Sequence, residues 1–194
     1  MNIDMTLEKE NKLQFTLKGA SAPFSNLVRR YLIGQLPTFA IDRVTFYENS
    51  SAMFDEYIAH RLGQVPLLSD ISRAKDEVVF TLEAEGPGTI YSKSLKSTDS
   101  KIKSALDDIP LLRLLEGQNL RLEAKARQGI GREHAKFQPG IMSYEMLSPT
   151  EFKFKVESFM QLEPRLMLTK SADMIIAKCD EFEEKLGEIK KEKE

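Results

Sequence analysis

Two runs of alternating apolar residues stand near the start of the chain. They are Ile3, Met5 and Leu7, then Leu13, Phe15 and Leu17, with a polar stretch at 8–12 between them. Successive side chains of a β-strand point to opposite faces, so each run predicts a strand with one apolar face. Together they predict a β-hairpin with one buried face.

The next segment has the apolar spacing of a helix. Ser21 is suited to cap it, Pro23 to its first turn, and Gly34 and Pro37 to end it. Its apolar residues follow the i, i+3, i+4, i+7, i+8 pattern: Phe24, Leu27, Val28, Tyr31 and Leu32.

The middle of the chain is predicted to be mostly strand. Residues 38–48, 79–85 and 120–127 are rich in β-forming or alternating residues. One short helix is expected to begin with Asp55 as its cap and to reach Leu62. Loops are expected at the glycine-rich points Gly86-Pro87-Gly88, Glu116-Gly117 and 129–140.

After a further alternating strand at 151–157, the period changes to that of a long helix. Apolar residues follow steps of four and three: Leu168, Ala172, Ile175, Cys179, Phe182, Leu186 and Ile189. This is the spacing of a coiled-coil seam, and a narrow stripe of about six turns needs an equally long covering surface. The middle of this chain could fold over it, a second chain could cover it, or it could be an ordinary surface helix on a sheet.

Composition excludes several classes of protein. With 41% hydrophobic and 30% charged residues the chain is neither disordered nor membrane-like, and a net charge of −2 offers no excess cation for nucleic-acid phosphates. A single cysteine, Cys179, makes neither an internal disulfide nor a multi-cysteine metal site. The first ten residues are not typical of a secretory signal, and no apolar run approaches a membrane span, so we expect a soluble cytoplasmic protein.

Candidate catalytic residues are few. Glu56 and His60 would share a helical face and could form a metal pair or an acid–base pair, although a surface role is more common at this spacing. His134 lies near glycines that match no complete phosphate-binding motif. Asp107-Asp108 resembles half of a metal site, but a solvated acidic turn is the more common structure for such a pair. Cys179 lies on the apolar seam. A small metabolic enzyme using Glu56, His60 or His134 is therefore the weaker hypothesis, and we expect no catalytic residue.

Several longer motifs carry a resemblance to a known family. They include Asn26-Leu27-Val28-Arg29-Arg30-Tyr31-Leu32-Ile33, Pro37-Thr38-Phe39-Ala40-Ile41-Asp42, Asp55-Glu56-Tyr57-Ile58-Ala59-His60-Arg61-Leu62-Gly63, Glu85-Gly86-Pro87-Gly88-Thr89 and Gly131-Arg132-Glu133-His134-Ala135-Lys136-Phe137-Gln138-Pro139. Over most of its length the chain resembles the D-subunit family of archaeal RNA polymerases, the counterpart of the bacterial alpha N-terminal domain and the eukaryotic third-largest subunit.

This resemblance implies an α+β fold with a discontinuous dimerisation domain and an inserted domain. The dimerisation domain would comprise residues 1–43 and 149–194, an antiparallel sheet with two helices. The β-rich inserted domain would comprise residues 44–148.

The resemblance also implies a non-catalytic assembly subunit of a DNA-directed RNA polymerase, a nucleotidyltransferase complex. It would pair with a small subunit, L, as a platform for the large catalytic subunits, with small subunits N and P docking as well and DNA reached only through the complex. The residues expected to face L are Phe24, Leu27, Tyr31, Leu168, Ala172, Ile175, Cys179, Phe182 and Leu186. Asn26, Arg29 and Arg30 are expected to face a large subunit, whereas their pattern alone is equally compatible with simple solvation.

Two further expectations complete this interpretation. Some relatives carry a cysteine-rich insertion holding iron–sulfur clusters, and only about ten residues separate Pro139 from the strand at 151, so no cofactor is expected. The alternative to the polymerase function is a homodimeric adaptor that uses the same C-terminal seam.

Overall fold

The computed structural model describes residues 1–71 and 77–191, which form two compact units. The first unit comprises residues 1–36, 140–158 and those from 163 onward, and the second comprises residues 37–139 and 159–162. The predicted α+β class is confirmed, with antiparallel sheets and helices in one discontinuous and one inserted unit. The boundaries expected at 43/44 and 148/149 fall inside the strand at 37–49 and at the end of the strand at 140–148.

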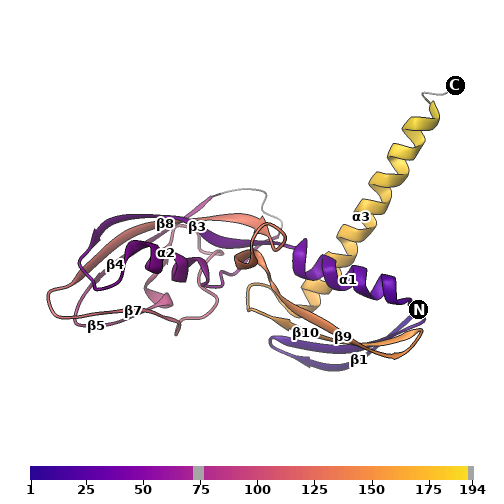
Figure 1. Cartoon of the computed structure of the whole chain (residues 1–194), viewed down its shortest axis with the longest axis horizontal. Helices are drawn as coiled ribbons and strands as arrows, with labels where there is room; N and C mark the ends of the chain where they lie inside the picture. Colours follow the sequence, from indigo (N-terminus) through magenta and orange to yellow (C-terminus); the bar gives the residue numbers. More distant parts are fainter. Residues whose placement is uncertain (72–76, 192–194) are drawn as a thin grey trace. The chain divides into compact units, whose positions relative to one another are not determined.

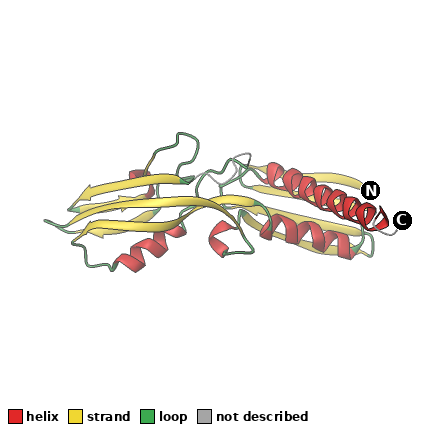
Figure 2. Cartoon of the chain, turned by 90° about the horizontal axis from the view of Figure 1, so that it is seen from above, coloured by secondary structure: helices red, strands yellow, loops and turns green. Residues whose placement is uncertain are grey.

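The first unit is a four-stranded antiparallel sheet with two helices on one face (Figures 1 and 2). The strand order is β1-β2-β10-β9. The strands are β1 (Asn2–Lys9), β2 (Lys12–Lys18), β9 (Gly140–Ser148) and β10 (Glu151–Ser158), and the helices are α1 (Ala22–Gly34) and α3 (Pro164–Lys191). The sequence pattern does not predict strand β9, because its apolar residues do not alternate cleanly.

Alternation in β2 and β10 produces the core of this sheet. Leu13, Phe15 and Leu17 pair in register with Val156, Phe154 and Phe152, and all six side chains are buried. The rings of Phe15 and Phe154 stack with centroids 4.9 Å apart. The predicted strand at 151–157 and its buried face are therefore confirmed.

Strand β1 behaves differently from its neighbour. It pairs with β2 as predicted, and the register places Ile3 opposite Leu17 and Met5 opposite Phe15, on the same inward face. Leu17 and Phe15 are each 4% exposed, whereas Ile3 is 58% and Met5 is 43% exposed. The expectation that the whole hairpin has a buried face is thus wrong for β1, because no element of the described chain covers that edge.

Helix α1 begins as the sequence predicts. The Ser21 side chain accepts a hydrogen bond from the backbone N–H of Phe24 at 3.5 Å, and proline occupies the first turn. The apolar stripe is only partly covered, since Leu32 is fully buried while Phe24 and Leu27 are 36% and 38% exposed. Ser25, a polar residue outside the predicted stripe, is fully buried instead.

The second unit has a four-stranded antiparallel sheet, ordered β3-β8-β4-β6, and a two-stranded ribbon, β5-β7. Its elements are β3 (Pro37–Asn49), α2 (Asp55–Gly63), β4 (Val78–Glu85), β5 (Gly88–Tyr91), β6 (Lys96–Ser97), β7 (Pro110–Leu114) and β8 (Asn119–Ile130), with short 3-10 turns at Ser92–Ser94 and Ala135–Phe137. One face of the sheet packs beneath α2 in a continuous core that includes Phe39, Ile58, Leu62, Phe80 and Leu122. The predicted strands at 38–48, 79–85 and 120–127 are confirmed.

The predicted cap of α2 is wrong. Phe54 occupies the N-cap position with an extended backbone, and Asp55 is the first helical residue. The Asp55 carboxylate accepts a hydrogen bond from the Asn49 side chain at 2.7 Å, which engages it outside the helix. Asn49 also donates to the backbone carbonyl of Met53, so this amide side chain fixes the turn from β3 into α2.

Candidate subunit interface

Helix α3 lies against its own unit only along its first turns. Met167 and Ser171 are fully buried, and Pro164 is buried with them. An ion pair of 3.4 Å between Arg165 and Glu8 joins the start of this helix to the end of β1. The helix then rises off the sheet (Figure 1), and every side chain from Ile176 to Ile189 is exposed.

The residues of the predicted seam divide along the same line. Leu168 and Ile175 are half-buried beside the covered turns, while Ala172 and Cys179 are exposed. The large apolar residues of the distal half remain open to solvent: Phe182 is 66%, Leu186 is 45% and Ile189 is 51% exposed. We call Cys179, Phe182, Leu186 and Ile189 the α3 ridge. Ile176, which is 59% exposed and lies off the seam, is an apolar residue that the heptad spacing missed.

Helix α1 places a second set of exposed apolar residues in this unit. Phe24 and Leu27 are exposed and Tyr31 is half-buried, as the helix packs on β9 and on α3 through its other side. Tyr31 lies close enough to α3 to act on Lys178. The pKa of Lys178 is raised mainly by its hydrogen bond to Glu181, and Tyr31 adds a smaller effect in the same direction. Helices α1 and α3 thus lie together in this unit, and which of their residues face a partner stays a prediction.

Two of the residues expected to face a large subunit form an ordered pair, and the third is exposed. The Asn26 side-chain oxygen accepts two hydrogen bonds from the Arg29 guanidinium, at 3.2 Å from Nε and 2.9 Å from Nη2. Both side chains are half-buried, and Arg30 beside them is exposed. Arg29 is thus held in one orientation by a residue one turn earlier on the same helix, which lowers the entropy lost when a partner binds it.

The residues considered for catalysis do not gather in one place. Glu56 and His60 are exposed on the surface of α2. The exposed His134 accepts a hydrogen bond from the backbone N–H of Lys136 at 3.1 Å, which caps a short 3-10 turn. Asp107 and Asp108 are exposed in the loop before β7. Within residues 1–71 and 77–191, no three His, Cys, Asp or Glu side chains are grouped as metal ligands would be, and no helix is long and apolar enough to cross a membrane.

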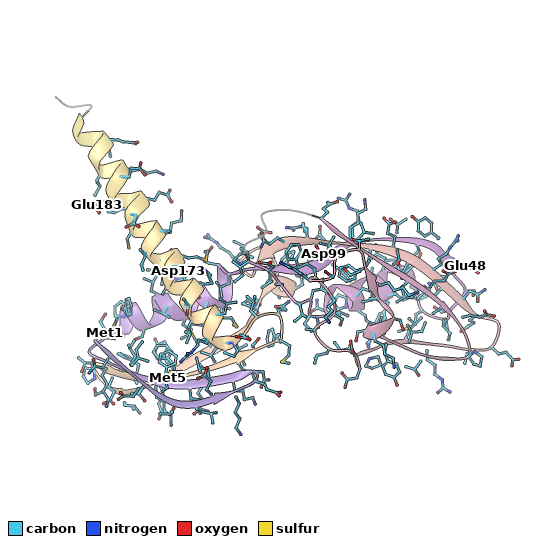
Figure 3. All side chains as sticks on the ribbon, turned by 180° about the vertical axis from the view of Figure 1, so that it is seen from behind. Met1, Met5, Glu48, Asp99, Asp173 and Glu183 are labelled. Atoms are coloured by element: carbon cyan, nitrogen blue, oxygen red, sulfur yellow. The ribbon has the colours of Figure 1, made fainter. Side chains whose placement is uncertain are left out.

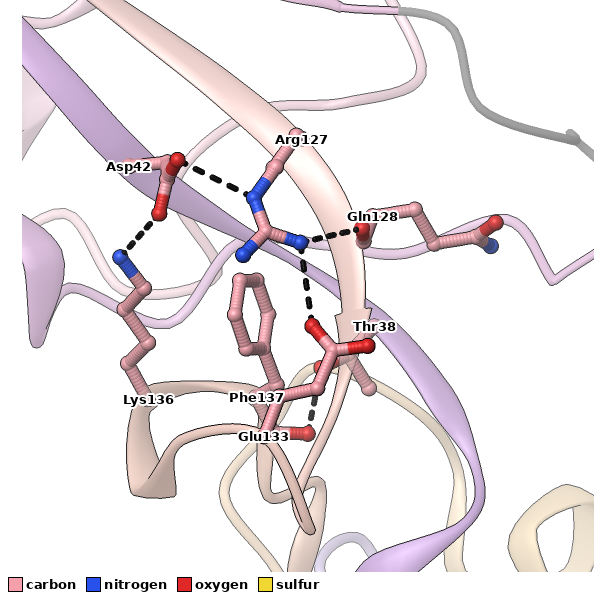
Figure 4. A network of polar contacts seen from close by, with 7 residues as sticks. All are labelled: Thr38, Asp42, Arg127, Gln128, Glu133, Lys136 and Phe137. Atoms are coloured by element: carbon pink, nitrogen blue, oxygen red, sulfur yellow. Dashed lines mark hydrogen bonds and ion pairs between the residues drawn. The ribbon is translucent and has the colours of Figure 1, made fainter.

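A polar cluster in the second unit fixes the loop that sequence analysis placed at 129–140 (Figure 4). Asp42 on β3 pairs with Lys136 at 2.6 Å and with Arg127 on β8 at 3.0 Å. The hydrogen bond from Lys136, opposed by partial burial and assisted by Arg127, holds the pKa of Asp42 below its usual value. Arg127 also pairs with Glu133 at 3.1 Å.

The same loop is anchored by an aromatic ring. The Phe137 side chain is fully buried, its ring lies 4.8 Å from the Arg127 guanidinium, and its carbonyl accepts a hydrogen bond from Thr38 at 2.7 Å. A Cβ atom on Gly129 would lie 2.7 Å from that ring, so this position requires glycine. These contacts explain the residue types of the loop as structural anchors.

Comparison with known proteins places both units in one family. The family model described as the RNA polymerase Rpb3/RpoA insert domain matches residues 44–145. DNA-directed RNA polymerase subunit Rpo3 of Methanocaldococcus jannaschii is 41% identical over 175 residues, which are 90% of this chain and 90% of the relative. The chain belongs to the Rpo3 family.

Longer members of the Rpo3 family match as well. The subunit of Pyrococcus furiosus is 40% identical over 171 residues, or 84% of this chain. That of Thermococcus kodakarensis is 42% identical over 166 residues, or 81% of this chain. The chain spans 66% and 64% of the lengths of these two relatives, just under two thirds.

Proposed function

We propose that this chain is an assembly subunit of an archaeal DNA-directed RNA polymerase. Its first unit serves as a dimerisation domain that pairs with the small subunit L. The pair is the platform for the large catalytic subunits, and small subunits N and P dock on it. The names of the relatives support a polymerase subunit, and the chain is proposed to contribute no catalytic residue and to hold no iron–sulfur cluster.

The single observation that supports pairing is the uncovered distal half of α3. Phe182, Leu186 and Ile189 lie at coiled-coil spacing on a helix that has left its own sheet. An apolar ridge of this length, left in water, has no stabilising role within the unit. Contact with a second chain would bury it at about 25 cal/mol per Å² before the costs of association.

Arg29 and Arg30 are proposed to bind a large subunit. The Asn26 contact holds Arg29 oriented without neutralising it, since an amide oxygen accepts hydrogen bonds but has no net charge. An oriented guanidinium beside an exposed one fits an acidic surface on the partner.

Co-expression with the small subunit tests this function. Leu186→Asp puts a charge on the α3 ridge, and capture of the small subunit by the tagged chain is expected to be lost, because an unpaired carboxylate would be desolvated in the interface. Ala177→Asp is the matched control: it adds the same charge on the same helix in line with Asp173, Asp180 and Glu184, on the charged face.

Equal capture by both variants would contradict the proposal. Sedimentation of the chain alone distinguishes the polymerase function from the alternative. A stable homodimer that Leu186→Asp dissociates would favour a homodimeric adaptor. A chain that aggregates alone and becomes soluble with the small subunit supports the polymerase function.

A further inference from the structure

The sheet of the second unit has a polar face that points away from the core. Helix α2 and the β5-β7 ribbon lie on one side of β3 and β8 (Figure 1). Arg43 directly precedes Val44, which packs on the core of that side. Lys125 lies between the buried Ala124 and Ala126. Because side chains alternate along a strand, Arg43 and Lys125 point to the opposite side, which we call the open face.

Two cations lie directly opposite each other on this open face. The register pairs Arg43 of β3 with Lys125 of β8, so their Cβ atoms are about 4.5–5.5 Å apart. Arg43 is exposed, Lys125 is half-buried, and neither forms an ion pair in the part of the chain that the structure describes. Like charges in this arrangement destabilise a sheet, so the fold alone does not favour them. We call Arg43 and Lys125 the cation pair.

The other charged residues of the open face do not oppose a like charge. Arg121 has Glu48 opposite it on β3 and Glu83 opposite it on β4. Glu123 lies opposite a threonine on each neighbouring strand. Among the described pairings of this sheet, the cation pair is therefore the one place where two side chains of the same charge face each other.

The open face changes the sign of its charge along β8. Arg121, which lies between two glutamates, is four residues from Lys125, or about 14 Å along an extended strand. Glu48 lies near the end of β3 (Figure 3). A run of phosphates along the strand would meet the cation pair and then the glutamates, which repel it. A protein segment can carry both signs of charge, so it can be complementary to both parts of the face.

We infer that the open face binds a segment of another protein that places acidic side chains on the cation pair. The Arg43 guanidinium can donate two hydrogen bonds to one carboxylate, and the Lys125 ammonium adds a second cationic donor beside it. A bound carboxylate also removes the repulsion between the two cations. The inference does not depend on the proposed pairing of the first unit, because it uses different residues and a different sheet.

A titration followed by nuclear magnetic resonance tests the inference with a defined probe. The isotope-labelled chain, kept with the small subunit where solubility requires it, is mixed with a peptide of four glutamates followed by four lysines. Signals of β3 and β8 around the cation pair are expected to shift. Arg43→Gln combined with Lys125→Gln should weaken binding about tenfold or more, because the charge-assisted contacts are lost.

A matched control removes the same charge from another sheet. Lys153→Gln combined with Lys155→Gln takes two cations from β10 of the first unit and should change the affinity less than about twofold. Equal weakening by the two double variants would show general attraction to the chain and overturn the inference. Absence of shifts around the cation pair would overturn it as well.

Two further measurements separate the inference from its rivals. The variant without the cation pair should unfold at the wild-type temperature or above it, because opposed like charges have been removed. A lower unfolding temperature would make the pair structural and contradict the inference. Tighter binding of an oligothymidylate of equal length at the same residues would show that the face binds nucleic acid instead. Capture of the small subunit is unaffected by any of these results, so the proposed function is tested separately.

Discussion

Replacing Phe182 by alanine is the most direct measure of what the α3 ridge does. The side chain is 66% exposed in the chain itself, so about two thirds of its burial remains to be gained. A fully buried phenylalanine side chain contributes about 1.5–3 kcal/mol. Phe182→Ala is therefore expected to weaken association by about 1–2 kcal/mol, or roughly five- to thirtyfold in Kd.

The same substitution should leave the isolated chain almost unchanged. An exposed side chain far from the core costs at most about 0.5 kcal/mol when truncated. Alanine also has a higher helix propensity than phenylalanine, which offsets part of that cost.

Met167 provides the opposite case on the same helix. It is fully buried in the first turns of α3, and its truncation to alanine is expected to lower the free energy of unfolding by about 2–5 kcal/mol. The two variants should thus separate: Met167→Ala lowers chain stability, and Phe182→Ala lowers affinity.

Urea unfolding of the chain and calorimetric titration with the small subunit measure the two quantities. If the chain alone is insoluble, it can be kept in complex with the small subunit, and the affinity is then measured from the dissociation of the complex on dilution. If Phe182→Ala lowered the free energy of unfolding as far as Met167→Ala does, the ridge would be packed within the chain and the reasoning refuted.

Three further predictions concern other parts of the molecule. Arg29→Ala combined with Arg30→Ala should leave the complex with the small subunit intact and weaken capture of a large subunit about tenfold at low salt; loss of folding would instead make these arginines structural. Gly129→Ala should cost about 1–3 kcal/mol in urea unfolding, because its Cβ would meet the Phe137 ring, whereas Gly88→Ala, with nothing within 4 Å of its Cβ, should cost far less. The pKa of Asp42 is lower in the folded chain than in the unfolded one, so the stability that this ion pair contributes is present at neutral pH and lost as pH falls through the folded pKa. Asp42→Asn should therefore flatten the loss of stability as pH falls below the ordinary aspartate pKa of about 3.9, and an unchanged pH profile would count against this ion pair.

Most elements could be predicted because their signals are local. The alternation of β2 and β10, the Ser21 cap and the four-three spacing of α3 each depend on residues close in sequence, and the structure has each element. Strand β9 was missed because Met146 and Leu147 break its alternation. The Asp55 cap failed because Asn49, six residues earlier, engages the carboxylate.

The candidate interface was predictable in part. The sequence by itself determined that α3 would be long, that its apolar residues would form a narrow seam, and that β1 would have an apolar face, since periodicity depends only on residue order and backbone geometry. Which of these residues are covered was decided by the tertiary structure alone. Helix α3 leaves the sheet after its first turns, so Met167 is buried while Phe182 is open, and Phe15 is buried while Met5, paired with it in register, is not. Burial depends on the path of the covering element through space, and no pattern within the covered segment records that path.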